Sequence, residues 1–446
     1  MASVYCNEEI KISKEYFGHP RELFILSFVE MWERFSFYGL RSLLIIYMSS
    51  FVFFEFPERV YGFYFLSFFY SSRSAVGYSS FVYGIYSGLI YLTPIFGGFI
   101  ADRLIDRRKV VIAGGVFIAL GHLLITDHAW FLWALFLIII GTGGLKGNIA
   151  AQVGDLYDIN DKRRERGFSL YYFSINIGAA ISPVICMIFV QKWGWTIAFD
   201  ATTVGMVIGL VTYFFYKPSV SNEKNKVSLN FVQDKKNVRI AYSVIVSVFF
   251  SSVLLWISYE QQANALVHWV STVPGDISVG WLQAIPPAVV IFGIPILNWV
   301  WGRQAGRYKE PDVFMKLFVG AVIISTSQVF ISFFAFLYGG ISPNKLTIAF
   351  YLIIWEVGDL FFTPAAMGLF SRFAPKKSGG LVMALWYATF FVGNIISGLI
   401  GTLWGVFSPE LYWSIVAIVV SAGAVWVFFL KRFFRGKVLR CLQSAV

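Results

Sequence analysis

Long apolar runs separated by short polar segments extend along the whole chain. A helix of about eighteen or more residues, at roughly 1.5 Å per residue, spans a hydrocarbon core about 30 Å thick. Because a bilayer offers backbone groups no water, segments that span it satisfy their own hydrogen bonds as helices. The pattern predicts an all-α polytopic membrane protein with twelve transmembrane helices, at residues 23–50, 78–101, 109–126, 129–153, 167–190, 195–216, 239–267, 279–302, 312–338, 346–372, 379–404 and 409–431.

The composition supports this interpretation, and one polar segment groups the helices. Hydrophobic residues make up 57% of the 446 residues and charged residues only 14%, which excludes an ordinary soluble protein. The long polar segment 217–238 falls between the sixth and seventh helices, where we expect a cytoplasmic linker. Residues 1–216 should form one six-helix bundle, and residues 239–446 a second with a short basic tail. This layout resembles the major facilitator superfamily, whose substrate sites lie near the midplane between the halves.

Lysine and arginine are distributed unevenly between the two sides of the membrane. Most fall near the chain ends, in segment 217–238 and in the loops on the same side, which places both termini in the cytoplasm. The net charge of +11 therefore indicates topology and not nucleic-acid binding. The exceptions are Arg59, Arg73, Lys192 and Lys345 in the opposite loops, and Arg34, Arg41 and Lys146 within helices.

Cysteine and histidine give no sign of a metal site. Cys6, Cys186 and Cys441 are far apart and belong to no CxxC pair or His-rich cluster, so we expect neither a disulfide nor a bound metal. The sequence also lacks HExxH and GxSxG motifs, which argues against a hydrolase. We expect no enzyme activity and no cofactor.

Residues 30–41, EMWERFSFYGLR, place charged side chains inside the first predicted helix. At about 100° per residue, these charged residues, Glu30, Glu33, Arg34 and Arg41, share with Phe37 and Tyr38 one face about 140° wide. A charge that faces lipid near the helix centre costs roughly 2.5–3.5 kcal/mol, so this face is expected to line a cavity. The simpler alternative is that the two acids only pair with Arg34 and hold helices together.

The stretch 52–77 is unusually aromatic for a loop outside the membrane. Aromatic side chains gather where a membrane meets water. The stretch is therefore interpreted in one of two ways, as an interfacial belt or as a lid over the first helical hairpin.

The stretch FGHPRELFILSFVEMWERFSFYGLRSLL resembles the first helix of the proton-dependent oligopeptide transporter family, which carries ExxERFxYYG. The match includes Glu30, Glu33, Arg34, Phe35, Tyr38 and Gly39. Further family motifs follow in order through both halves: YLTPIFGGFIADR at 91–103, GTGGLKGNIAAQVGD at 141–155, FSLYYFSINIGAAISP at 168–183, YEQQ at 259–262, VGDLFFTP at 357–364 and MALWYATFFVGN at 383–394.

The resemblance implies that a set of charged residues couples protons to movement. Glu30 and Glu33 are expected to interact with Lys146 and, together with Arg34, to link proton binding to the conformational change. A carboxylate that loses a cationic partner in a low-dielectric cavity binds a proton more readily. Protons, and no bound cofactor, would then be the coupling ion.

The resemblance also implies a substrate site with opposite charges at its two ends. Glu260 is a second proton carrier by this resemblance, and it pairs with Arg41 until protonation or substrate releases it. Arg41 and Lys146 suit a substrate carboxylate, whereas Asp359 suits an ammonium group. Further residues expected to shape the pocket are Tyr38, Tyr91, Asn176 and Trp386, with Trp256 and Glu356 as additional candidates.

Four positions depart from the family pattern. Gly147 replaces a proline after Lys146, Phe37 replaces the first tyrosine of YYG, Ile285 replaces an asparagine, and Asp359 replaces a glutamate. The leading interpretation is a proton-coupled symporter that imports di- and tripeptides by alternating access. The alternatives are a transporter of another small zwitterion, such as an amino-acid derivative, and a non-transporting receptor on the same scaffold.

The remaining expectations concern a loop, the membrane and the partners. Asp102 and Arg103, in GGFIADRLIDRRK, resemble a superfamily loop that locks conformations and does not touch substrate. The short connection YGGISPNK suits a bacterial inner membrane, where the chain would span the bilayer many times. We expect short peptides and the lipid bilayer as partners, no nucleic acid, and function as a monomer.

Overall fold

The computed structural model describes residues 15–54, 57–71, 74–157, 161, 163–216, 235–271, 276–307, 311–372 and 379–443. A two-stranded antiparallel hairpin, β1 (Glu15–Tyr16) and β2 (His19–Pro20), precedes the helices. The first half has α1 (Arg21–Tyr47), π-helix η1 (Met48–Val52), 3-10 helix η2 (Pro57–Arg59), α2 (Phe63–Phe69), α3 (Ala75–Arg103), α4 (Arg107–Leu124), α5 (Phe131–Asp155), α6 (Arg164–Trp193) and α7 (Trp195–Phe215). The second half has α8 (Lys235–Gln261), α9 (Ala265–Val270), α10 (Ile277–Arg307), α11 (Val313–Leu337), α12 (Lys345–Arg372), α13 (Gly379–Gly401) and α14 (Pro409–Gln443).

Eleven spans in the described residues are long and apolar enough to cross a membrane, one of which combines α8 and α9. The remaining predicted span, 109–126, corresponds to helix α4. This helix is only 18 residues long and begins with Arg107, Arg108 and Lys109, so it carries more charge over 18 residues than the other spans do. The predicted pattern of long helices therefore matches the structure.

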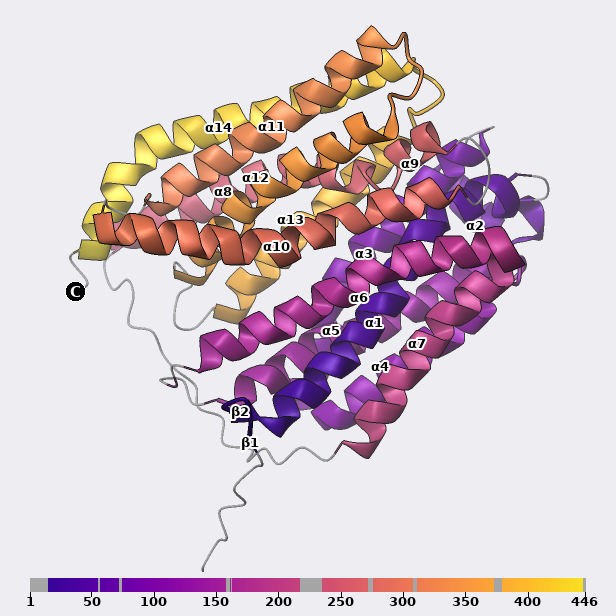
Figure 1. Ribbon diagram of the computed structural model, residues 1–446, viewed down its shortest axis with the longest axis horizontal. Helices are drawn as coiled ribbons and strands as arrows, with labels where there is room; N and C mark the ends of the chain where they lie inside the picture. The colour runs from indigo at the N-terminus through magenta and orange to yellow at the C-terminus, as the bar shows by residue number, and fades with distance from the viewer. Residues whose placement is uncertain are drawn as a thin grey trace, which may run out of the picture.

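The helices form two groups that lie side by side (Figure 1). In the first half α1 packs on α6 and α7, and α5 packs on α3 and α4. In the second half α11 packs on α12 and α14, while α8 packs on α13 and α14. Between the halves α3 packs on α13, and α6 on α10. The division at 217–238 stays a prediction, because residues 217–234 lie outside the described residues; α8 already begins at Lys235.

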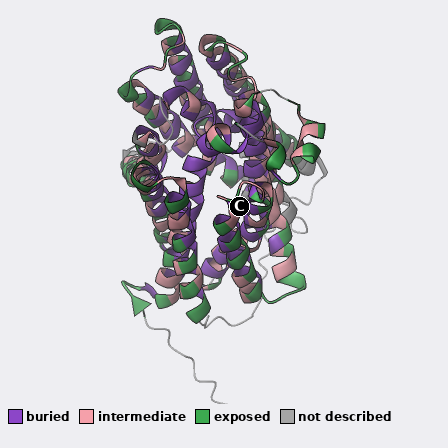
Figure 2. Cartoon of the chain, turned by 90° about the vertical axis from the view of Figure 1, so that its right-hand side faces the viewer, coloured by how far each residue is buried: buried purple, intermediate pink, exposed green. Residues whose placement is uncertain are grey.

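Each half has apolar cores of its own, and one core reaches across. We call the end of the helices that adjoins segment 217–234 the linker end, and the opposite end the far end. A cluster built mainly from the far-end parts of α1, α3 and α5 also contains Ala263, Val267 and Val279 of the second half. Buried residues lie between the helices and exposed ones on the outer faces (Figure 2). The halves therefore share apolar packing at the far end.

Glycines bring the two halves into backbone contact at this end. A Cβ atom on Gly84 of α3 would lie 2.5 Å from the Cα atom of Gly398 in α13. A Cβ atom on Gly280 of α10 would likewise lie 2.5 Å from the carbonyl oxygen of Pro183 in α6. Nearby, the Ser80 hydroxyl donates a hydrogen bond of 2.8 Å to the Asn264 side-chain oxygen. The far end is closed by contacts that larger residues would prevent.

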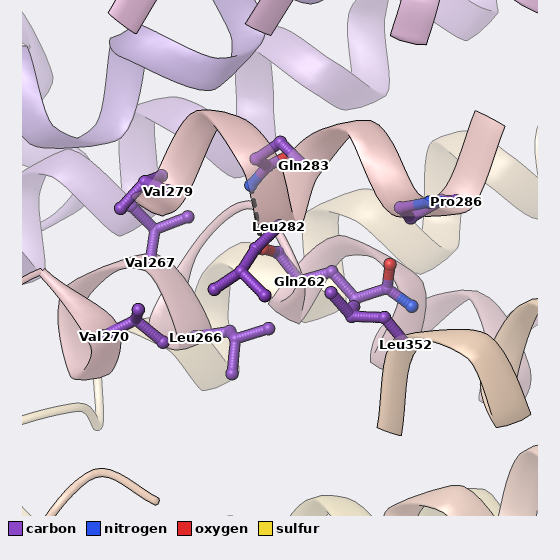
Figure 3. Close-up of a pocket in the computed structure, with 9 residues that line it drawn as sticks. All are labelled: Gln262, Leu266, Val267, Val270, Val279, Leu282, Gln283, Pro286 and Leu352. Carbon is purple, nitrogen blue, oxygen red and sulfur yellow. Dashed lines mark hydrogen bonds between the residues drawn. The ribbon is translucent and has the colours of Figure 1, made fainter. Parts of the chain in front are cut away.

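The prediction of one unbroken helix over residues 239–267 is wrong. The helix α8 ends at Gln261, and α9 begins at Ala265 after three residues. At the break, the Gln283 side chain donates a hydrogen bond of 3.0 Å to the Gln262 carbonyl oxygen, beside a small, mainly apolar pocket (Figure 3). The segment contains no glycine or proline to announce a break, so only the tertiary contacts explain it.

Candidate functional site

Arg41 joins the two halves through a buried ion pair. Its Nη2 atom lies 3.3 Å from Oε2 of Glu260, which is 219 residues away. The Arg41 Nε–H donates to the Tyr83 hydroxyl at 3.0 Å, and Nη1–H donates to the Tyr259 hydroxyl at 3.2 Å. The Tyr83 hydroxyl in turn donates to Glu260 at 3.2 Å. Helices α1, α3 and α8 thus contribute to one hydrogen-bonded network, in which the charge pair is joined to the two tyrosine hydroxyls.

Close packing of α1 against α6 positions this arginine. Gly39, two residues before Arg41, faces α6, and a Cβ atom there would lie 2.6 Å from the Ser182 hydroxyl. The Ser182 hydroxyl donates to the Phe35 carbonyl oxygen on α1. The same part of α1 therefore packs closely against α6 with one face, and with another face it directs Arg41 toward the second half.

Glu30, Glu33 and Arg34 pair with one another within α1. Arg34 Nε lies 3.2 Å from Oε1 of Glu30 and also contacts Glu33. The Arg34 guanidinium lies 5.2 Å from the centre of the Phe37 ring. Glu30, Glu33 and Arg34 are all buried. The predicted charged face is thus enclosed by the protein, and its proton-coupling role stays a prediction.

Lys146 rests on an aromatic ring. Its Nζ atom lies 4.2 Å from the centre of the Tyr91 ring, a distance typical of a cation–π contact. Tyr91 of α3 stacks on Phe390 of α13 with ring centres 4.7 Å apart. Among the described residues Lys146 has no ion pair, although Glu30 and Glu33 lie close enough to act on it electrostatically. The expected interaction with these acids is thus a long-range one in this conformation.

Aromatic rings of the second half continue from Phe390. Trp256 of α8 stacks on Phe390 with ring centres 4.1 Å apart, and Trp386 meets the same ring edge-on at 5.4 Å. Trp355 of α12 lies beside Tyr259 at 5.1 Å and donates its indole N–H to Ser258. These rings connect the Lys146 side of the interface with the Arg41 side.

Two carboxylates lie on α12 near the same interface. Asp359 is half-buried and accepts a hydrogen bond from Thr363 one turn later. Glu356 is buried, and within the described part of the chain its Oε2 atom has no hydrogen-bond partner. Both acids act electrostatically on Tyr172 of α6 across the interface. Asn176 is buried on that same helix, and its side chain donates to the Tyr172 carbonyl oxygen at 2.9 Å.

The predicted conformational loop contains an ion-pair network at the linker end. Arg107 contacts Asp102 at 3.0 Å and Asp155 at 2.7 Å, which ties α3, α4 and α5 together. Arg103, the other predicted residue, lies over the Phe99 ring at 5.1 Å. Neither Asp102 nor Arg103 lies in the group around Arg41, as expected for a loop that does not touch substrate.

Sequence reasoning missed several residues of this site. Tyr83 bonds to both Arg41 and Glu260, yet it belongs to no motif and has no distinctive neighbours in the sequence. Tyr259 lies inside the YEQQ motif next to Glu260, so that motif could have predicted its contact with Arg41. Phe390 lies inside MALWYATFFVGN, and only the fold shows which of its aromatic residues meets Tyr91.

Comparison with known proteins places this arrangement in a family. The model of the POT family matches residues 108–242 and 219–413. The chain belongs to the POT family. Within the described ranges, no group of three or more His, Cys, Asp or Glu is placed to hold a metal ion.

Relatives of this POT family member cover nearly its whole length. A peptide transporter of Yersinia enterocolitica subsp. palearctica is 27% identical, over 87% of this chain and 88% of the relative. A di-/tripeptide transporter of Lactococcus lactis subsp. cremoris is 23% identical, over 92% and 94%. A crystal structure of a POT family transporter in complex with 5-aminolevulinic acid is 25% identical, covers 95% of this chain and 98% of that one, and has a TM-score of 0.78. The fold is therefore that of the major facilitator superfamily, in a multi-pass membrane protein.

Proposed function

We propose that the chain is a proton-coupled symporter that imports di- and tripeptides by alternating access. The observation that carries this proposal is the buried Arg41–Glu260 ion pair between the halves, with Tyr83 and Tyr259 as its hydrogen-bond partners. A guanidinium held by one carboxylate is suited to exchange that carboxylate for another, such as the end of a peptide. The peptide transporters among the relatives support the choice of substrate.

The proposed cycle begins when a proton neutralises Glu260. Arg41 then loses its buried counter-charge, and a substrate carboxylate restores the pairing. Because a buried charge without a partner is strongly unfavourable, proton and substrate binding favour each other. Rocking of the halves then opens the linker end, where the proton and the substrate leave.

Asp359 takes the ammonium end of the substrate in this proposal. It is half-buried and, among the described residues, accepts a hydrogen bond from Thr363 alone, so it retains acceptor capacity for a cation. Lys146 and the rings of Tyr91, Phe390 and Trp256 would contact the middle of the substrate. Glu356 lies one turn before Asp359 on α12.

A second candidate substrate is a small zwitterion, such as an amino-acid derivative. Asp359 is one methylene shorter than the family glutamate, and Ile285 removes an amide that the family usually offers. A structural relative at 25% identity was crystallised with 5-aminolevulinic acid, which carries an amine and a carboxylate at its two ends. Arg41 and Asp359 supply the matching charges for either substrate.

Uptake into proteoliposomes with an imposed proton gradient tests the proposal. Dipeptides, tripeptides, single amino acids and 5-aminolevulinic acid are compared at equal concentration. Gradient-driven uptake of di- and tripeptides is expected; preference for 5-aminolevulinic acid would select the second candidate. Binding of these compounds without any uptake would favour a receptor and contradict both.

The amine site has its own test. In the parent, blocking the substrate amine should weaken binding by about tenfold or more, the typical effect of losing one charged hydrogen bond. Asp359→Asn should bind blocked and free substrate alike. Equal affinity of the parent for both would remove the role given to Asp359.

We also propose a bacterial inner membrane as the location, both termini in the cytoplasm, and function as a monomer. The positive charges of the linker-end loops and of the tail support this orientation. Labelling of single cysteines in intact cells tests the orientation, since far-end positions should react with an impermeant reagent and linker-end positions should not.

A further inference from the structure

The short helix α2 exposes an aromatic face at the far end of the first half. Tyr64, Phe65, Phe68 and Phe69 are 75%, 73%, 84% and 63% exposed. They occupy one side of a helix only seven residues long, and residues 60–71 carry no charged side chain. Four large aromatic residues in contact with water would form an unusually apolar patch.

The opposite face of α2 is firmly attached to the first half. The Phe63 ring lies 5.2 Å from Tyr78, and the Tyr70 ring stacks on Phe81 at 4.8 Å; both partners belong to α3. Leu66 packs against the far-end core. The exposed aromatic face is therefore presented by a fixed element and not by a freely moving loop.

The start of α2 is fixed as well. The Tyr61 backbone N–H donates to the Ala129 carbonyl oxygen at 2.9 Å, and the Tyr61 ring meets Trp130 edge-on at 5.3 Å. Gly62 has a φ of +94°, a left-handed conformation that turns the chain into α2. The exposed face thus continues onto Trp130 and Trp133, which are exposed at the far end of the spanning helix α5.

We propose that α2 lies in the bilayer interface at the far end, with its aromatic face among the lipid headgroups and upper acyl chains. Continuity with the lipid-facing surface of α5 supports lipid as the occupant. Aromatic residues suit this layer, and an amphipathic helix lies in the plane of the membrane with its apolar face downward. The contacts given above for α2 leave Tyr64, Phe65, Phe68 and Phe69 exposed, whereas in a lid over the first hairpin this aromatic face would pack against the helices.

Spin-label accessibility tests this proposal without any need for transport. Cys6 and Cys441 are replaced by serine and Cys186 by alanine, and single labels are placed by Phe65→Cys and Phe68→Cys. Val204→Cys, on an exposed position of spanning helix α7, is the lipid reference; Glu58→Cys, an exposed acid just before α2, is the water reference. Each labelled protein is reconstituted in single-copy nanodiscs and exposed to oxygen and to a water-soluble nickel chelate.

In the expected result, the ratio of oxygen to nickel collisions at residues 65 and 68 is several-fold above that at residue 58 and below that at residue 204, which lies near the middle of its span. A ratio like that of residue 58 would overturn the proposal, because α2 would then stand in water. Low collision rates with both reagents would also overturn it, since protein, in a lid or a second copy, would cover the face. Two label positions guard against the failure of one variant to fold.

Discussion

The far end and the linker end of the molecule use charge differently. At the far end the Arg41–Glu260 pair joins the two halves, and α3 and α13 touch through Gly84 and Gly398. At the linker end the described ion pairs stay within the first half, as in the contacts of Arg107 and Arg163. Contacts between the halves must break and form during alternating access, whereas contacts within a half need not. The far-end pair is therefore the place where protonation can act on the conformation.

Neutralising the far-end pair should have the largest effect. Glu260→Gln keeps the shape of the side chain but binds no proton there. A potential of 100 mV contributes about 2.3 kcal/mol per proton moved, which corresponds to roughly 50-fold accumulation of substrate. We expect gradient-driven accumulation to fall by about that factor, while exchange of labelled for unlabelled substrate persists. Glu58→Gln, on the exposed surface, is the control and should transport like the parent.

Conservative substitutions of Arg41 and Arg34 separate a contact between the halves from a contact within α1. In Arg41→Lys the ammonium group cannot bond to Tyr83, Tyr259 and Glu260 at the same time, as the guanidinium does. The KM for the substrate should therefore rise by about tenfold or more. Arg34→Lys keeps a cation beside Glu30 and should change KM by less than about threefold. Equal increases in KM for both variants would mean that Arg41 has no special role in substrate binding.

A methyl group at the far-end contact should shift the balance between conformations. Gly84→Ala would place its Cβ 2.5 Å from Gly398, and overpacking of this kind typically costs about 1–3 kcal/mol. Gly98→Ala, in the same helix with nothing within 4 Å, is the matched control. Spin labels on Glu58 and Ile341 should report longer far-end distances in Gly84→Ala only. The same distances in both variants would contradict far-end closure through this contact.

The smallest effect is expected at the linker end, outside the membrane-spanning segments. Hydrogen bonds from Arg163 hold the pKa of Asp161 below its ordinary value of 3.8. Stability from this pair is therefore present above pH 3.8 and fades as the pH falls through the lower folded-state value. Asp161→Asn should lower Tm in detergent slightly at pH 6, and the difference from the parent should shrink below pH 4. Transport near neutral pH should change little.

Local sequence patterns predict one part of this molecule well. Apolar runs locate the long helices, and the spacing of Glu30, Glu33, Arg34 and Arg41 predicts a face that the structure buries. The family motif at YEQQ points to Glu260 as a partner of Arg41, and these two residues form an ion pair. These predictions are possible because each depends only on residues close together in one helix, or on a motif of the family.

Contacts between distant segments could not be predicted in the same way. Tyr83 reaches Glu260 across 177 residues, and no periodicity or motif identifies it. The break at residues 262–264 coincides with contacts from other helices, from Gln283 to the Gln262 carbonyl oxygen and from Ser80 to the Asn264 side chain, and not with a local breaker residue. Lys146 meets the Tyr91 ring where an acid was the expected neighbour. Each of these features depends on how the two halves meet.

The central claim is that a proton on Glu260 frees Arg41 for the substrate carboxylate. Measuring the Kd of a dipeptide and of its C-terminal amide against pH, in the parent and in Glu260→Gln, tests it most directly. In the parent, the Kd of the dipeptide should fall with decreasing pH by up to about tenfold per unit, the limit for one linked proton. The amide, and Glu260→Gln with either ligand, should show little pH dependence. A Glu260→Gln protein that keeps the pH dependence of the parent would contradict the claim.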